Sequence, residues 1–346
     1  MDIEELKNKI VNYSGKNIRI MEVCGTHTHE IFRLGVRSLL PENVKLISGP
    51  GCPVCVTPVS YIDEAVYLAK KGAAVFTFGD LMRVPGSDET LSDARRNGAK
   101  VEIVYSPLDA LKYAKKHTNE EVVFLSVGFE TTTPSSCIAL KNAEKENVNN
   151  FSLLTANKTM DEAYLAMADS ADAYLYPGHV TAITGTEKLE KLAQKGISGV
   201  VAGFTAKEIL TAIYTIIEEC KKGSPFFQNA YKNVVKKEGN PGAVKLVNRY
   251  MTPIDSEWRG IGVLKNSGLD LKDEFASFDA RKKFNMPKIE GKANPACRCG
   301  DVLKGAIEPS SCPLFGKVCT TAHPIGACMV SAEGACAAFY QYGVSR

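Results

Sequence analysis

Residues 17–23 of this chain read NIRIMEV, and residues 24–30 continue as CGTHTHE. The first stretch is a short run rich in apolar and β-branched residues, which predicts a strand buried on both faces. Similar runs follow as VKLIS, AAVFTF and VEIVYS at residues 44–48, 73–78 and 101–106. Strands buried on both faces are typical of a parallel sheet that is covered by helices.

Amphipathic stretches lie between these predicted strands. YIDEAVYLAKK at residues 61–71 places Ile62 and Val66 on one helical face, and PLDALKYAKKH begins at Pro107, a favourable first-turn residue. A second series of strands is predicted for EVVFLSV, FSLLTA, ADAYLY and SGVVAGF, at residues 121–127, 151–156, 171–176 and 198–204. This alternation predicts an α/β fold with parallel sheets and right-handed crossovers.

The two series resemble each other. LAKKG precedes AAVFTF and LAQKG precedes ISGVVAGF, while Pro50-Gly51 after one strand is echoed by Pro177-Gly178 after another. Chance similarity between two βα units is one explanation, and two related domains are the other. We favour the second, and predict similar parallel-sheet domains at residues 15–120 and 121–240 that face a cleft. Ligands of such sheets bind beyond the carboxyl ends of the strands.

The alternation stops near residue 240. Residues 240–294, including NPGAV and MTPIDSEW, are expected to be irregular, and residues 295–340 are rich in cysteine with little apolar periodicity. A segment of this kind needs a metal or a cluster in place of an apolar core. We therefore predict a C-terminal iron–sulfur domain at residues 241–346.

Composition excludes several classes of protein. The net charge is only +3 and basic residues alternate with acidic ones, so nucleic acid is not an expected partner. No apolar window reaches 18 residues, and the N-terminal MDIEELKNKIVNY reads as an amphipathic helix without a signal-peptide core. We expect no membrane association and a cytoplasmic location. Eleven cysteines in a reducing compartment indicate metal or redox chemistry.

Six of the cysteines lie within 40 residues of the C-terminal segment, namely Cys297, Cys299, Cys312, Cys319, Cys328 and Cys336. Four thiolates suit either zinc or an iron–sulfur cluster. Zinc ribbons usually carry paired CxxC knuckles, and this segment has no CxxC. The irregular spacing and the number of sulfurs favour a [4Fe-4S] cluster with two further thiols.

Two loops near the N-terminus carry the other candidate sites. Cys52 and Cys55 form a CxxC that suits reversible dithiol chemistry, the alternative being half of a zinc site. In CGTHTHE, Cys24 follows a predicted strand, and His27 and His29 follow within five residues. A buried structural histidine is the common outcome for such a pair. We favour a thiolate that binds a soft or borderline metal, or an activated nucleophile.

The remaining candidates are weaker. VGFETTTP at residues 127–134 predicts a helix N-cap before Pro134, and the free amides there are equally suited to an anionic group. His179 in YPGHVT is assigned to loop structure, and Cys137 and Cys220 to helices of the core. Neither GxxxxGK[ST] nor GxGxxG occurs, so no motif supports nucleotide binding.

The motifs MEVCGTHTHE, SGPGCPVCVTP, VGFETTTP, YPGHV and CRCGDVLKG with its four later cysteines together resemble the HypD family of hydrogenase maturation factors. The resemblance runs from about residue 15 to the end and departs at none of the cysteines. It implies a scaffold, rather than a conventional turnover enzyme, on which the Fe(CN)2CO group of [NiFe]-hydrogenase is assembled. The implied partners are the chaperone HypC and the cyanide donor HypE.

The resemblance also implies residue roles. Cys24 corresponds to the iron-binding cysteine with His27 beside it, and Cys52 and Cys55 correspond to a redox dithiol. The implied ligands of a [4Fe-4S] cluster are Cys297, Cys312, Cys319 and Cys336, which leaves Cys299 and Cys328 as a further redox pair. The tail is similar to the cluster–disulfide arrangement of ferredoxin:thioredoxin reductase. Rival interpretations are a stand-alone thiol–disulfide reductase and a zinc-stabilised binding protein.

Overall fold

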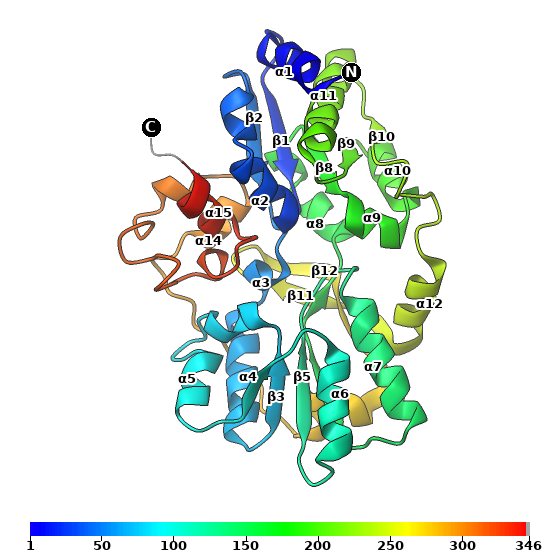
Figure 1. Cartoon of the computed structure of the whole chain (residues 1–346), viewed down its shortest axis with the longest axis vertical. Coiled ribbons are helices and arrows are strands. Elements are labelled where there is room, and N and C mark those ends of the chain that lie inside the picture. The colour runs from blue at the N-terminus through cyan, green and yellow to red at the C-terminus, as the bar shows by residue number, and fades with distance from the viewer. Residues whose placement is uncertain (344–346) are drawn as a thin grey trace.

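The computed structural model describes residues 1–343 and contains two parallel sheets (Figure 1). The first, sheet A, has the strand order β10-β9-β8-β1-β2. Its strands are β1 (Ile18–Glu22), β2 (Val44–Ser48), β8 (Ala173–Pro177), β9 (Gly199–Ala202) and β10 (Phe227–Asn229). The side chains of β8 are buried throughout and those of β1 and β2 nearly so, which confirms strands buried on both faces.

Helices cover sheet A, and the apolar faces of two of them pack together. These helices are α1 (Ile3–Val11), α2 (Gly25–Arg33), α9 (Gly178–Thr184), α10 (Glu187–Gln194) and α11 (Ala206–Lys222). Ile10 of α1 and Ile213 of α11 are fully buried in one apolar cluster with Ile20 of β1. A capping box of Thr205 and Glu208 begins α11, and Gly223 with a φ of +73° ends it.

Sheet B has the order β4-β3-β5-β6 and lies below sheet A in Figure 1. It comprises β3 (Ala74–Thr77), β4 (Val101–Ile103), β5 (Val122–Ser126) and β6 (Phe151–Thr155), with α4 (Val59–Lys70), α5 (Leu91–Arg96), α6 (Pro107–Lys116) and α7 (Thr133–Lys145). All pairs in the two sheets are parallel. The predicted α/β class with two parallel-sheet units is therefore confirmed.

The order of strands along the chain differs from their order in space. The predicted range 15–120 supplies β1 and β2 to sheet A but β3 and β4 to sheet B, and the range 121–240 likewise supplies strands to both. The similar sequences LAKKG before β3 and LAQKG before β9 also lie in different kinds of connection between strands. The first connects sheet A to sheet B, whereas the second joins two strands of sheet A.

Residues 241–271 are regular, so the expectation of irregular structure is wrong there. α12 (Pro241–Tyr250) leads into β11 (Met251–Trp258) and β12 (Gly262–Leu271), an antiparallel hairpin that pairs with β7 (Asn157–Lys158). Four of the eight side chains of β11 are exposed, and Pro253 is tolerated because β11 is an edge strand. A partly solvated hairpin lacks the continuous apolar run that marks the other strands.

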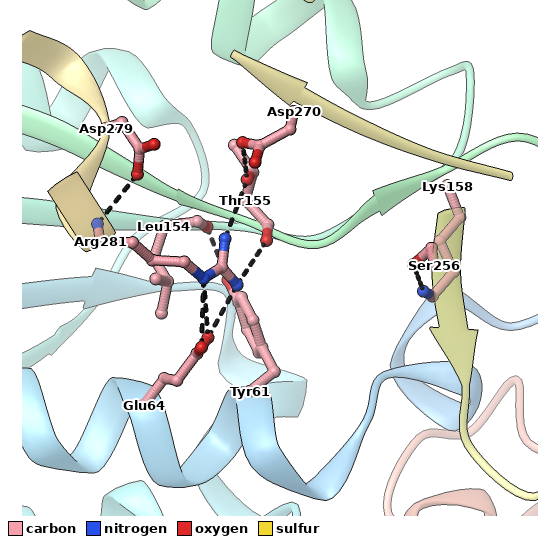
Figure 2. Close-up of polar contacts among 9 residues, drawn as sticks. All are labelled: Tyr61, Glu64, Leu154, Thr155, Lys158, Ser256, Asp270, Asp279 and Arg281. Atoms are coloured by element: carbon pink, nitrogen blue, oxygen red, sulfur yellow. Dashed lines mark hydrogen bonds and ion pairs between the residues drawn. The ribbon is translucent and has the colours of Figure 1, made fainter. Parts of the chain in front are cut away.

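The segment after this hairpin is fastened to sheet B by Arg281 (Figure 2). The guanidinium of Arg281 donates to both carboxylate oxygens of Glu64 on α4, at 2.7–3.1 Å, and to the Thr155 carbonyl at 3.1 Å. Thr155 in turn donates to Asp270 of β12 at 2.7 Å. Arg281 thus links α4, β6 and the end of the hairpin at one edge of the sheet.

The cysteine-rich segment has little secondary structure, as predicted. It contains α14 (Cys299–Leu303) and α15 (Ala335–Tyr342), and it lies beside α2 and α3 (Pro53–Val56) in Figure 1.

The remaining helices are α8 (Asp161–Ala166), α13 (Ala280–Lys283) and the short 3-10 turns η1 (Val36–Leu39), η2 (Gly79–Arg83), η3 (Ala168–Ser170), η4 (Asp273–Phe278), η5 (Pro309–Ser311) and η6 (Ala327–Met329). None of the helices in residues 1–343 is both long enough and apolar enough to traverse a bilayer.

Candidate metal and thiol centre

Three loops meet at the carboxyl edge of sheet A because β8, β1 and β2 are neighbouring parallel strands. The register pairs Glu22 at the end of β1 with Ser48 of β2 and with Leu175 of β8. The chain leaves these strands through Cys24, through Gly51-Cys52 and through Gly178-His179. Such an edge is where α/β sheets bind ligands.

The loops after β1 and β2 approach each other at backbone distance. The amide of Gly25 donates to the carbonyl of Gly51 at 2.9 Å, and the amide of Gly49 donates to that of Glu22 at 2.8 Å. A Cβ atom at position 51 would lie 2.1 Å from the amide nitrogen of Cys24. Glycine at position 51 is therefore required for Cys24 and the CxxC to lie side by side.

Cys24 is the N-cap residue of α2, and its side chain is only 2% exposed. Burial raises the pKa of its thiol to about 12, although the amides of His27 and Thr26 act in the opposite direction. The thiol is thus neutral at pH 7 in the absence of a metal. Coordination of a cation removes the proton outright, so this environment favours the thiolate only when a metal is bound.

The imidazole nitrogen beside the Cys24 thiol belongs to His179. Its Nδ1 atom lies 3.9 Å from Sγ of Cys24, and His179 is in the first turn of α9. The sequence predicts loop structure for His179, although Pro177-Gly178 repeats the earlier Pro50-Gly51. This repeated dipeptide is the sequence feature that points to His179, because the two loops follow the strands on either side of β1.

His27 and His29 make other contacts. Nε2 of His27 donates to the carbonyl of Gly203 at 2.8 Å, and its ring stacks at a tilt on Phe204. Burial lowers the pKa of His27 to about 4, so the ring is neutral, and its Nδ1 has no partner within residues 1–343. His29 is half-buried, and its Nδ1 lies 3.4 Å from the carbonyl of Ala332.

The GFETTTP loop contributes a buried carboxyl group. A threonine caps α7, but it is Thr132, one residue earlier than a helix starting at Pro134 requires, and its side chain makes no capping hydrogen bond. Glu130 accepts a hydrogen bond from the Met160 amide at 2.9 Å through one oxygen, and its other oxygen is unpartnered within the described chain. Burial, with Asp161 nearby, raises the pKa of Glu130 to about 7.

The CxxC lies at the start of α3. Cys52 caps this helix, with its Sγ 3.4 Å from the amide of Cys55. Cys55 is completely buried, and the nearby thiols of Cys52 and Cys328 influence the pKa of its own thiol. Burial raises the pKa of Cys55 well above its ordinary value. The Cys55 thiol also lies 4.0 Å from the carbonyl of Ala327, the neighbour of Cys328, although 272 residues separate them in sequence.

The series continues from one thiol to the next. The thiols of Cys299, Cys336 and Cys55 all lie near enough to Cys328 to influence the pKa of its thiol. Cys299 also lies near Cys297. A continuous series of sulfur atoms thus connects the CxxC to the C-terminal segment. All eleven cysteines are free thiols.

Five C-terminal cysteines line one small cavity of about 10 Å³, namely Cys297, Cys299, Cys312, Cys319 and Cys336. Val302, Leu314, Phe315 and Met329 complete its largely apolar wall. A Cβ atom at Gly326 would lie 2.7 Å from Sγ of both Cys297 and Cys299, so glycine keeps this space open. The amide of Ile325 points to Sγ of Cys319 at 3.4 Å. Thiols around an apolar cavity, with amide donors to sulfur, fit an iron–sulfur cluster.

The same thiols do not converge on a single point. Within residues 1–343, no three cysteine, histidine, aspartate or glutamate side chains are arranged as ligands of one metal ion. A four-iron cluster, in contrast, is held by thiolates spread around a volume. The spread of the thiols suits such a cluster, but the cavity between them has room for about one water molecule, so the thiols must move apart to hold a cluster.

Together, the fold and the thiol series define a cysteine-rich α/β protein whose reactive groups lie at a sheet edge and in an adjoining sulfur-lined cavity. A family model described as "HypD: Hydrogenase formation hypA family" matches residues 2–343. The chain belongs to this HypD family of hydrogenase maturation factors.

Curated relatives agree with this assignment. The chain is 41% identical to the hydrogenase maturation factor HypD of Escherichia coli K12 over 350 residues, which cover 98% of this chain and 94% of that protein. It is also 41% identical to HypD of Cupriavidus necator over 343 residues, which cover 95% and 90%. A putative hydrogenase expression/formation protein of Methanocaldococcus jannaschii is 41% identical over 339 residues, which cover 97% and 94%.

Proposed function

We propose that this protein is the scaffold on which the Fe(CN)2CO group of [NiFe]-hydrogenase is assembled, with the iron bound as cargo by Cys24. The observation that carries the proposal is the buried Cys24 thiol, which has His179 at 3.9 Å and the CxxC loop against its backbone. A thiolate donates electron density to Fe(II), which strengthens back-donation to cyanide and carbon monoxide. Burial excludes water that would compete for the open coordination positions.

The second part of the proposal concerns the sulfur-lined cavity. Cys297, Cys312, Cys319 and Cys336 would hold a [4Fe-4S] cluster there, since all four line the cavity that Gly326 keeps open. When bound, such a cluster supplies single electrons. Cys299 and Cys328 would form the adjoining redox pair, because Cys328 lies near both Cys299 and Cys55.

Thiol–disulfide exchange would then carry reducing equivalents to the CxxC. The Cys328 thiolate attacks Sγ of Cys55 in a Cys52–Cys55 disulfide, and Cys52 leaves as a thiolate that takes up a proton. The Cys299 thiolate next attacks Cys328 in the mixed disulfide and releases Cys55. Two electrons pass from the Cys299–Cys328 pair, which becomes a disulfide, to the Cys52–Cys55 pair, which becomes a dithiol beside Cys24.

The proposed partners are a HypC-type chaperone and HypE, with all steps in the cytoplasm. One thiolate and one imidazole supply too few ligands for a closed iron site, so a partner would contribute a further ligand and HypE would deliver cyanide. A second function is favoured by the unbroken thiol series. In that alternative, the protein is a cluster-linked thiol–disulfide reductase, and Cys24 plays no part in it.

Infrared spectroscopy of the anaerobically purified protein in complex with its HypC-type partner distinguishes these functions. The scaffold predicts cyanide and carbon monoxide bands that disappear in Cys24→Ala and persist in Cys137→Ala, a buried thiol of α7. Iron and sulfide analysis should give about four of each per chain for the cavity. Normal bands in Cys24→Ala overturn the assignment of Cys24, and stoichiometric zinc without iron overturns that of the cluster.

A further inference from the structure

A turn of the β11–β12 hairpin lies between the CxxC and the cysteine-rich segment, and Arg259 occupies this turn. The amide of Arg259 donates to the carbonyl of Val56, the last residue of α3, at 2.9 Å. The next residue, Gly260, packs on α14, where a Cβ atom would lie 2.5 Å from Cα of Gly300. The backbone of this turn thus contacts the helices that carry Cys55 and Cys299.

The guanidinium of Arg259 is buried without a carboxylate partner. The residue is 8% exposed, its Nη2 donates to the carbonyl of Pro85 at 3.0 Å, and its Nε has no partner within residues 1–343. Asp88, Glu89 and Asp93 line the cavity of about 520 Å³ beside it, but none of them forms an ion pair with Arg259 in the described chain. A buried cation in this setting is costly unless a negative charge compensates it.

Thiols are among the groups that lie near Arg259. Arg259 lines that cavity together with Cys297, Cys299 and Gly326. Burial lowers the pKa of Arg259, and the opposing influences come from Cys299, Cys328, Cys297 and Cys55, with no carboxylate among them. Arg281 is the contrasting case in this chain, because it is paired with Glu64.

We propose that Arg259 is the counter-ion of the cysteine-ligated cluster and a positioning residue for the CxxC beside it. The proposal rests on the assignment of a cluster to the cavity made above. Thiolate ligands give the cluster site negative charge, and Arg259 supplies a buried positive charge that lines one cavity with Cys297 and Cys299. Its backbone bond to Val56 holds that charge at the junction of the cluster cavity and the CxxC helix.

Loss of a counter-ion should change the stability of the cluster-free protein and that of the cluster-bound protein in opposite directions. Without the cluster, no carboxylate in residues 1–343 compensates Arg259, so its replacement by Met removes an uncompensated buried charge and should not destabilise the chain. With the cluster, the same replacement leaves negative charge without compensation. Reduction adds a further negative charge, so loss of the cation should also make the cluster harder to reduce.

The test compares Arg259→Met, Arg259→Lys and Arg281→Met in the full chain, both cluster-free and reconstituted. We expect Arg259→Met to unfold at the same or a higher urea concentration than the wild type when cluster-free. When reconstituted, it should lose its visible cluster absorption about 10–100-fold faster, the usual effect of removing an outer partner of a metal site. Its cluster midpoint potential should shift to more negative values, and Arg259→Lys should restore most of that shift.

Arg281→Met serves as the matched control, because that arginine has a carboxylate partner far from the cysteines. It should lower the urea midpoint in both states and leave the cluster potential unchanged. Equal destabilisation of both states by Arg259→Met, its failure to fold, or an unaltered potential would overturn the counter-ion role while the cluster assignment stands. A wild type that takes up no iron and sulfide overturns the cluster assignment itself, and the counter-ion role with it.

Discussion

The Sγ atom of Cys24 lies 3.9 Å from Nδ1 of His179, although 155 residues separate them in the chain. The two are brought together because β1 and β8 are adjacent parallel strands and both residues follow the carboxyl ends of these strands. His27, only three residues from Cys24, instead directs its Nε2 to the carbonyl of Gly203. The histidine that is remote in sequence is therefore the one placed to act with the thiol.

The first prediction separates these two histidines. His179→Ala should fold normally but retain about 10-fold less iron at the Cys24 site, because an imidazole beside the thiolate is lost. His27→Ala should lower the free energy of unfolding by roughly 1–3 kcal/mol, because the buried carbonyl of Gly203 loses its donor. Iron analysis of a variant without the cluster ligands, together with urea unfolding, checks both. Full iron retention by His179→Ala would contradict the role given to it.

A second prediction concerns the proximity of Cys55 and Cys328. In the double variant Cys52→Ser/Cys299→Ser, each of the two remaining thiols has lost its partner, so a mild dithiol oxidant should join them in a Cys55–Cys328 disulfide. Peptide mass spectrometry under non-reducing conditions identifies the bond. Cys52→Ser/Cys328→Ser is the control and should yield far less of a Cys55–Cys299 bond. Equal yields would mean that the exchange does not follow the observed proximity.

The third prediction addresses the cavity. Gly326→Ala places a methyl group 2.7 Å from Sγ of Cys297 and Cys299, so the thiols must shift and cluster uptake should fall by about 10-fold or more. Gly79→Ala is the control, since its new methyl group meets only Cγ2 of Ile103, at 3.7 Å. Iron, sulfide and visible absorption after anaerobic reconstitution measure the effect. Equal loading of the two variants would place the cluster elsewhere.

The local sequence pattern is sufficient to predict individual strands and helices but not to predict which strands pair in a sheet. Runs such as VKLIS were recognisable because a strand buried on both faces is apolar along its length. No local signal states that β1 pairs with β8 rather than with a strand of its own half, and the partner of Cys24 followed from that pairing. The hairpin of β11 and β12 is not predicted from the sequence, because its partly solvated strands lack a continuous apolar run.

The sequence reveals a candidate site only where the residue types themselves suggest a specific chemistry. The cysteines were found from spacing alone, because clustered thiols in a reducing compartment have few structural uses. Arg259 was not found, since an isolated arginine in a sequence carries no sign that it will be buried among thiols. Glu130 was noticed only as part of a helix start, and its unpartnered oxygen depends on packing between segments distant in sequence.

A fourth prediction follows from the pKa of Glu130, which burial raises to about 7 from 4.5. The folded protein therefore holds a proton that the unfolded chain releases between pH 4.5 and 7, so the stability that Glu130 contributes is greatest below pH 4.5 and is lost as the pH rises. Glu130→Gln should gain stability over the wild type across this range, by up to about 3 kcal/mol. Urea unfolding at several pH values checks this. The exposed Glu290→Gln is the control and should show no such trend.

The fifth prediction concerns the linkage in Figure 2. Arg281→Met should lower the free energy of unfolding by roughly 2–4 kcal/mol, because Glu64 loses a two-pronged, largely buried partner. The double variant Glu64→Gln/Arg281→Met should be more stable than the sum of the two single effects. Strict additivity in urea unfolding would show that the pair is not energetically coupled.

The interleaving of the two sheets has a consequence for synthesis on the ribosome. Ile20 of β1 pairs with Ala173 of β8, so β1 emerges long before this neighbour exists. At about 5–20 residues per second, this delay is on the order of ten seconds. Sheet B needs only residues 74–155 for its strands and can close within that interval. The nascent chain would thus hold β1 and β2 as exposed apolar strands beside a finished sheet B, the period when it most depends on chaperones.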